Sequence, residues 1–85
     1  MIPLDFTDYK QLEHLRGSLE RYFQNRIEPG SFLTAVLSND LVGSYARADS
    51  QNIRLIGDIV SFLYNRAPAG AWGSPERVTA WLKGQ

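Results

Sequence analysis

Apolar residues recur at three- and four-residue steps through the first third of the chain, which is the period of an amphipathic helix. The stripe consists of Leu12, Leu15, Leu19, Tyr22, Phe23 and Ile27. We expect Asp8 to cap this helix and Glu28-Pro29-Gly30 to end it, because proline lacks the donor that a helix interior requires. In front of the helix, residues 1–7 alternate apolar and other side chains, and predict an extended arm that packs on the body.

Two short helices are predicted next. Ser31 is placed to cap a helix over residues 32–37. The tripeptide Ser38-Asn39-Asp40 then favours a turn, because its side chains can hydrogen-bond their own backbone. Asp40 can cap the second short helix over residues 41–48.

After a break at Asp49-Ser50, the chain becomes strongly apolar over residues 51–66. Eight of the twelve residues from 53 to 64 are apolar, and a helix that is apolar nearly all round is normally buried by its neighbours. The exceptions recur at three- and four-residue steps and predict one narrow exposed face: Arg54, Gly57, Asp58 and Ser61.

A closing helix is predicted at Ser74-Pro75-Glu76, which combines a capping serine, proline at the first helical position and an acidic first turn. Residues 65–73 form the loop before it. The apolar face of this helix consists of Val78, Trp81 and Leu82. Together these patterns predict an all-α fold: a compact single-domain bundle of about five helices, two long and three short, over residues 1–85.

Composition narrows the function classes. The 85 residues include nine basic and nine acidic groups and no cysteine, which excludes disulfides and thiolate metal sites. The balanced charge makes nucleic acid an unlikely partner, since a phosphate backbone requires a strong positive patch. No segment reaches the ~18 apolar residues of a membrane span, and the N-terminus lacks a signal pattern, so we expect no membrane partner and a cytoplasmic location. Such a small core favours self-association or a protein partner.

Candidate catalytic groups are few. His14 is the only histidine and falls in the middle of the first predicted helix, where packing or solvent exposure explains it better than a catalytic base does. Asp40, Asp49 and Asp58 recur every nine residues, which invites a carboxylate-cluster interpretation. Helix capping by the first two, and an ion pair between Asp58 and Arg54, account for them more simply. We therefore predict no enzymatic activity, no metal and no cofactor.

The best candidate for a binding site combines aromatic rings, arginines and side-chain amides at two breaks between helices. The first group is Tyr45, Arg47, Asp49 and Asn52, and the second is Tyr64, Asn65, Arg66 and Trp72. Arginine beside aromatic rings can stack on and hydrogen-bond a nucleobase or a small anion. The same side chains can instead anchor loops to the core or contact a partner protein, and the sequence leaves all three interpretations open.

Two glycines, Gly43 and Gly57, fall inside predicted helices, where glycine costs about 1 kcal/mol relative to alanine. Close approach of another helix would explain that cost. Space for a ligand against the backbone would explain it as well.

Residues 30–82 resemble a family of small helical proteins of tailed bacteriophages and prophages that has no assigned activity. The shared string is GSFLTAVLSNDLVGSYARAD, followed by Asn52 and by IVSFLYNRAPAGAWGSPERVTAWL. The resemblance implies a phage or prophage origin and a bacterial host cytoplasm. Phage proteins of this size often act by binding, in host takeover or against host defence.

We therefore expect a non-enzymatic binding protein that acts on a host or phage protein, with a host-takeover or anti-defence role. A small-molecule binder that sequesters a nucleotide is the alternative, based on the same arginine and aromatic residues. A DNA-binding helix-turn-helix protein and a small enzyme have less support, because the sequence shows neither a basic recognition face nor a nucleophile–base pair.

Overall fold

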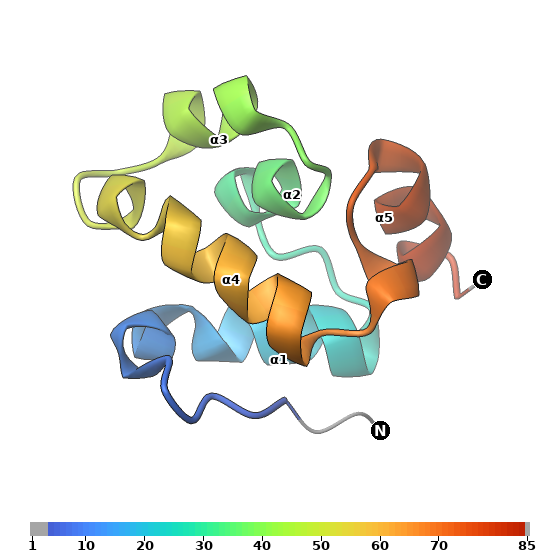
Figure 1. Ribbon diagram of the computed structural model, residues 1–85. Coiled ribbons are helices and arrows are strands. Elements are labelled where there is room, and N and C mark those ends of the chain that lie inside the picture. The colour runs from blue at the N-terminus through green and yellow to red at the C-terminus, as the bar shows by residue number, and fades with distance from the viewer. Residues whose placement is uncertain (1–3, 85) are drawn as a thin grey trace.

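The computed structural model describes residues 4–84, and all regular structure within them is helical. The elements are η1 (Lys10–Leu15), α1 (Arg16–Asn25), α2 (Ser31–Leu37), α3 (Leu41–Arg47), η2 (Asn52–Arg54), α4 (Ile56–Arg66), η3 (Ala69–Ala71) and α5 (Pro75–Leu82), where η marks a 3₁₀ helix. In Figure 1, α4 crosses between α1 on one side and α2 with α3 on the other, and α5 closes the end of the molecule. The predicted all-α class with five helices is confirmed.

The N-terminal arm packs on the body, as predicted for residues 4–7. Leu4 and Phe6 are both buried, and the Phe6 ring stacks on Phe62 with 4.4 Å between ring centroids. Residues 1–3 lie outside the described part of the chain. The expected cap at Asp8 is wrong: Asp8 has a positive φ of 73°, and the first helix begins as a 3₁₀ segment after Tyr9 with no side-chain cap.

The first helix also ends earlier than expected, at Asn25 instead of at the proline. Arg26 adopts a left-handed conformation with φ 57°, and its amide bonds the carbonyl of Tyr22 at 3.1 Å, the pattern of an αL cap. The Arg26 guanidinium lies 3.8 Å from the Trp81 ring centroid and donates to the Trp81 carbonyl at 2.7 Å. These contacts offset the strain that a non-glycine residue meets in this conformation. Ile27 therefore leaves the apolar stripe and is 48% exposed.

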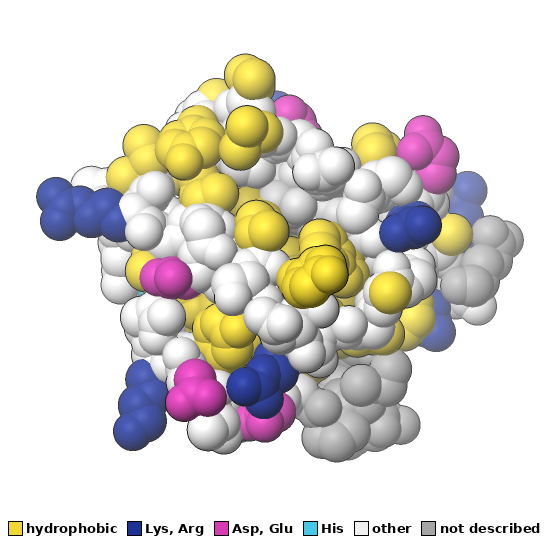
Figure 2. All heavy atoms as spheres, viewed as in Figure 1, with side chains coloured by type: hydrophobic (Ala, Val, Ile, Leu, Met, Phe, Trp, Pro, Cys, Tyr) yellow, Lys and Arg dark blue, Asp and Glu magenta, His cyan; other side chains and the backbone are white. Residues whose placement is uncertain are grey.

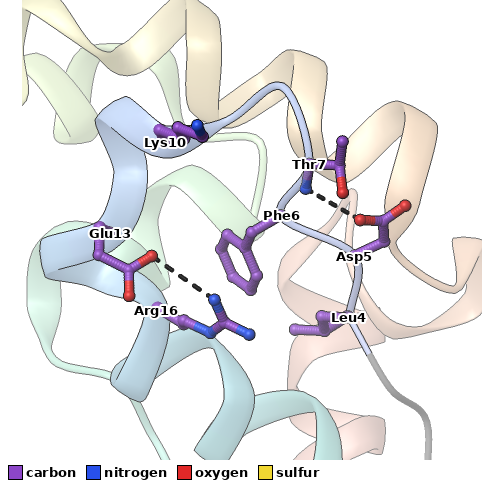
Figure 3. Close-up of a pocket in the computed structure, with 7 residues that line it drawn as sticks. All are labelled: Leu4, Asp5, Phe6, Thr7, Lys10, Glu13 and Arg16. Carbon is purple, nitrogen blue, oxygen red and sulfur yellow. Dashed lines mark hydrogen bonds and ion pairs between the residues drawn. The ribbon is translucent and has the colours of Figure 1, made fainter.

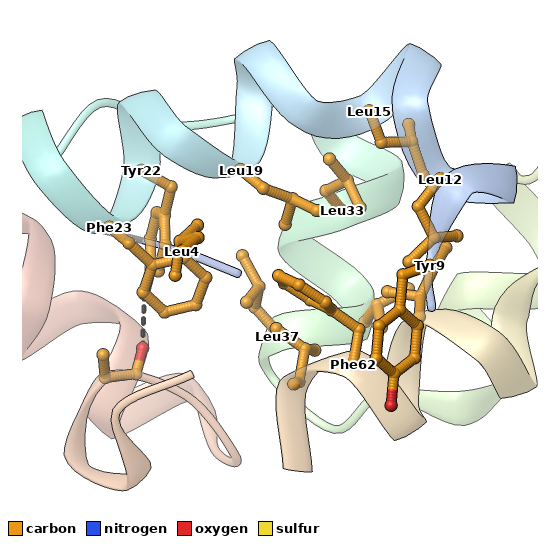
Figure 4. Packing of buried hydrophobic residues seen from close by; sticks show 14 of the residues in the cluster. Leu4, Tyr9, Leu12, Leu15, Leu19, Tyr22, Phe23, Leu33, Leu37 and Phe62 are labelled. Carbon is orange, nitrogen blue, oxygen red and sulfur yellow. Dashed lines mark hydrogen bonds between the residues drawn. The ribbon is translucent and has the colours of Figure 1, made fainter. Parts of the chain in front are cut away.

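One continuous core joins the arm, α1, α2, α4 and α5. Figure 4 shows leucines of η1 and α1 and the aromatic rings of α1 on the side that faces Leu37 and Phe62. The Tyr22 hydroxyl donates to the carbonyl of Ala71 at 2.7 Å, and Trp81 Nε1 donates to the Tyr22 carbonyl at 2.8 Å. These bonds fasten η3 and α5 to α1.

The segment from α2 to α3 is a helix-turn-helix unit. Asp40 caps α3, as predicted, by accepting from the Gly43 amide at 2.9 Å. The buried Ser44 hydroxyl donates to the Asp40 carbonyl at 2.6 Å. A Cβ at Gly43 would collide with the Asp40 carboxylate, so the cap itself requires glycine there. The expected serine cap on α2 is wrong, since Ser31 is the first helical residue and Gly30 precedes it without a side-chain bond.

Burial of the segment 51–66 differs from the expectation of all-round burial. Asp49 Oδ1 accepts from the Gln51 and Asn52 amides at 3.0 and 2.7 Å in the turn before η2. The expected helix cap at this break is not formed, because neither η2 nor α4, which begins only at Ile56, has a side-chain cap. Val60 is 43% exposed and Tyr64 is 80% exposed. The expected ion pair between Asp58 and Arg54 is not formed: none of the salt bridges among residues 4–84 joins these two side chains. Only one side of α4 faces the core.

The closing helix α5 begins as predicted. Ser74 Oγ accepts from the Arg77 amide at 3.1 Å, and Pro75 occupies the first helical position. Between residues 4 and 84, no helix has the length and apolar character needed to cross a bilayer.

Candidate functional site

The most exposed group of large apolar side chains in the described chain lies on α3. Leu41 is 64% exposed, Val42 is 80% exposed and Tyr45 is 50% exposed. We call these three residues the α3 patch. Figure 2 shows hydrophobic side chains gathered over this corner of the molecule.

The patch is exposed because of how α3 is attached. The helix has seven residues and buries only Gly43 and Ser44, both of which serve the Asp40 cap. Small residues therefore face α2, and the large apolar side chains are left facing solvent. This orientation follows from the cap and not from the apolar pattern.

Charged groups on α3 are engaged locally. Arg47 Nη1 donates to the Gly43 carbonyl of its own helix at 3.2 Å, and it is the only basic residue in the helix. In helix-turn-helix proteins that bind DNA, the second helix presents basic and polar side chains to the major groove. Here the second helix presents an apolar surface, which suits contact with protein.

A second exposed apolar feature lies on α4, and we call it the α4 seam. It consists of Gly57, Val60 and Tyr64, which share one face because they are three and four residues apart. A Cβ added at Gly57 would meet no atom within 4 Å. Close packing inside the chain therefore does not explain this glycine. Leu41 and Val60 line one shallow groove, so the seam adjoins the α3 patch.

The predicted residues at the first break are mostly engaged by the chain itself. Asp49 accepts from the Asn52 amide at 2.7 Å, and Asn52 Oδ1 lies 2.8 Å from Nε2 of His14 in an exposed hydrogen bond. Arg47 bonds its own helix. Tyr45 is the one large apolar side chain of the four, and it is half-exposed.

The second predicted group behaves in the same way. Asn65 Nδ2 donates to the Ser61 carbonyl at 2.9 Å, and Arg66 forms a salt bridge with Asp5 at 2.7 Å. Trp72 is partly buried against the core. Tyr64 is the member that stays exposed, and the structure therefore separates the two tyrosines from six side chains that hold loops or pack.

A hollow of about 550 Å³ lies beside the N-terminal arm, at residues that no sequence pattern had singled out as a site. Its lining is Leu4, Asp5, Phe6, Thr7, Lys10, Glu13 and Arg16. Figure 3 shows the Phe6 ring beside the Arg16 guanidinium, which lies 5.0 Å from the ring centroid. A hydrogen bond from Thr7 lowers the pKa of Asp5. The hollow holds two acidic and two basic groups, so it has no net preference for an anion or a cation.

A smaller hollow of about 280 Å³ is lined by Tyr64, Trp72 and Arg77, with small residues between them. Trp72 Nε1 is buried and has no hydrogen-bond partner among residues 4–84. An aromatic ring and an arginine beside it can together hold a flat polar ring by stacking and charge.

Neither a search for metal-binding groups nor comparison with known proteins identifies a site in this structure. No grouping of three or more histidine, cysteine or carboxylate side chains able to hold a metal ion occurs within the described residues. Comparison with protein-family models, with curated proteins and with solved structures finds no match for this chain. The geometry alone therefore carries the functional argument.

Proposed function

We propose that this chain is a non-enzymatic binding protein that docks a partner protein on the α3 patch. The observation that carries this proposal is the exposure of Leu41, Val42 and Tyr45 on a single seven-residue helix. Fully burying a large apolar side chain contributes about 1.5–3 kcal/mol. At the observed exposures, the three side chains together offer a partner roughly 3–6 kcal/mol before the costs of association. That is enough for the central cluster of an interface.

The nature of the partner follows from the chemistry of the patch. Its side chains carry one phenolic hydroxyl and no charge, and the adjacent Arg47 is engaged by the Gly43 carbonyl. A nucleic-acid backbone would gain little from such a surface. An apolar or aromatic side chain of another protein would be removed from water on this surface and would contribute the free energy of its burial.

The biological setting we propose comes from the resemblance to phage and prophage proteins. The partner would be a host or phage protein in the bacterial cytoplasm, and the role would be host takeover or the blocking of a defence system.

Pull-down from bacterial lysate tests the proposal. Val42→Arg places a charge at the centre of the patch, where Val42 contacts little of its own protein, so the fold should be unaffected. Ile27→Arg is the matched control, since Ile27 is 48% exposed and lies outside the patch. We expect wild-type and Ile27→Arg baits to recover the same proteins and Val42→Arg to lose them. Equal recovery by all three baits would show that the patch has no docking role.

The hollow beside Trp72 supports a second candidate function, the binding of a small nucleotide-like ligand. Arg77 would supply the charge, and Tyr64 and Trp72 would supply the stacking surface. Thermal-shift screening against mononucleotides and cyclic dinucleotides tests it. A stabilisation that disappears in Arg77→Ala supports this function, and no response across the panel rejects it.

A further inference from the structure

The α4 seam carries a glycine that the chain's own packing does not need. Gly57 lies within α4 and is exposed, and a Cβ there would meet no other atom within 4 Å. Its φ is not in the left-handed region, so the backbone does not require glycine either. Two other glycines lie in α-helices: Gly43 is explained by the Asp40 cap, and a Cβ at Gly17 would lie 3.1 Å from the Arg21 guanidinium. Gly57 therefore destabilises the helix relative to alanine, and no contact within one chain compensates for that loss.

The large side chains beside Gly57 are exposed in the same direction. Val60 and Tyr64 follow it by three and seven residues, the spacing of one helix face. The Tyr64 ring projects from this face, and the helix backbone at Gly57 is uncovered, so the two features are complementary in shape. A single helix cannot bring them together, because they are two turns apart on the same side.

We infer that the α4 seam is the contact through which two copies of this chain associate. An antiparallel pair of α4 helices, related by a two-fold axis near Val60, places Tyr64 of each copy over Gly57 of the other. The two Val60 side chains then meet at the axis. Such a two-fold contact is isologous, which is the commonest arrangement in homodimers.

Area and charge are consistent with this occupant. A tyrosine offers about 150–250 Å² to burial, and Tyr64 is 80% exposed. Complete burial of the exposed parts of the seam and of the neighbouring Ile53 would remove roughly 400 Å² per copy from solvent, or ~800 Å² in total, which is in the range of a weak, transient interface. The chain carries no net charge, so two copies do not repel each other. We therefore expect a weak dimer whose population rises with protein concentration.

Disulfide trapping tests the geometry directly, because the chain has no cysteine of its own. Val60→Cys should form a covalent dimer under mild oxidation at about 100 μM protein, at least tenfold faster than Ile27→Cys. A mixture of Gly57→Cys and Tyr64→Cys chains should cross-link to each other faster than either chain cross-links to itself. If Val60→Cys dimerises no faster than Ile27→Cys, the seam is not a self-association contact.

A separate variant distinguishes docking from stability. Gly57→Ala should raise the melting temperature, measured at low micromolar concentration, by about 2–8 °C because alanine favours the helix. It should also weaken dimerisation at least tenfold, because its Cβ occupies the place of the tyrosine ring. Gly17→Ala on α1 is the control, expected to stabilise the helix and leave the dimer intact. A Gly57→Ala chain that dimerises like wild type in analytical ultracentrifugation overturns the inference. The inference is also overturned if the chain stays monomeric at 1 mM and the seam binds only a foreign protein. This outcome is independent of the Val42→Arg test on α3.

Discussion

Replacing Phe62 with alanine should remove most of the stability of this protein. Phe62 is completely buried, stacks on Phe6 with ring centroids 4.4 Å apart, and meets the edge of Tyr9 at 5.3 Å. Truncating a buried phenylalanine to alanine costs about 3–5 kcal/mol, from lost burial and from the cavity left behind. The two ring contacts place this site toward the upper part of that range.

That loss is large compared with the whole free energy of unfolding. A domain of 85 residues has roughly 4–13 kcal/mol of stability. Urea unfolding at 25 °C, followed by far-ultraviolet circular dichroism at about 5 μM protein, should show the midpoint falling by roughly 2–3 M. The slope should stay unchanged, since the variant alters stability and not the surface exposed on unfolding.

Tyr64→Ala is the matched control for this measurement. Tyr64 lies two residues away on the same helix but is 80% exposed, so its removal should change stability by no more than about 0.5 kcal/mol. The reasoning fails if Phe62→Ala costs less than about 1 kcal/mol, or if the two variants cost the same. Either result would mean that α4 turns a different face to the core.

Two further predictions concern groups with defined partners. Burial raises the pKa of Tyr22 to about 12, while the unfolded chain ionises near 10, so the folded state should lose stability as pH rises from about 10 to 12. Tyr22→Phe removes this contribution to the pH dependence. At neutral pH it leaves the Ala71 carbonyl without its 2.7 Å donor and should cost about 1–3 kcal/mol; an alkaline unfolding profile identical to wild type would contradict the assignment. Ser74→Ala removes the cap on the Arg77 amide and should cost about 1 kcal/mol in urea unfolding, whereas Ser74→Asp should retain the cap.

Local chemistry in the sequence predicted helix boundaries well where a side chain bonds the nearby backbone. Asp40 and Ser74 both cap as expected, because each cap depends only on an amide three positions away. The end of α1 depends on distant residues. Arg26 tolerates its left-handed backbone because Trp81 lies beside it, and no local pattern carries that information.

The hydrophobic periodicity of the sequence could not predict which helix faces are exposed. An apolar pattern shows which residues share a face, but not which face another element covers. On α4, Val60 and Tyr64 look as apolar as Phe62, yet they face solvent. On α3, the small residues Gly43 and Ser44 take the buried side because the Asp40 cap fixes the helix there.

The eight candidate binding residues named from the sequence fall into two groups in the structure. The two tyrosines of the predicted set, Tyr45 and Tyr64, do lie exposed on α3 and α4. The arginines do not share that surface, since Arg47 bonds the Gly43 carbonyl and Arg66 pairs with Asp5. Residue type left loop anchoring, protein contact and ligand binding open, and the two tyrosines are the members of the set that form exposed apolar surface.

Photo-cross-linking in bacterial cells tests the central claim most directly. A benzoylphenylalanine in place of Val42, at the centre of the α3 patch, should give a discrete cross-linked adduct with one bacterial or phage protein. The same probe in place of Ile27, which is exposed elsewhere, should give none. Identical cross-linking patterns from the two positions, or no adduct from either, would contradict the assignment of α3 as the binding surface.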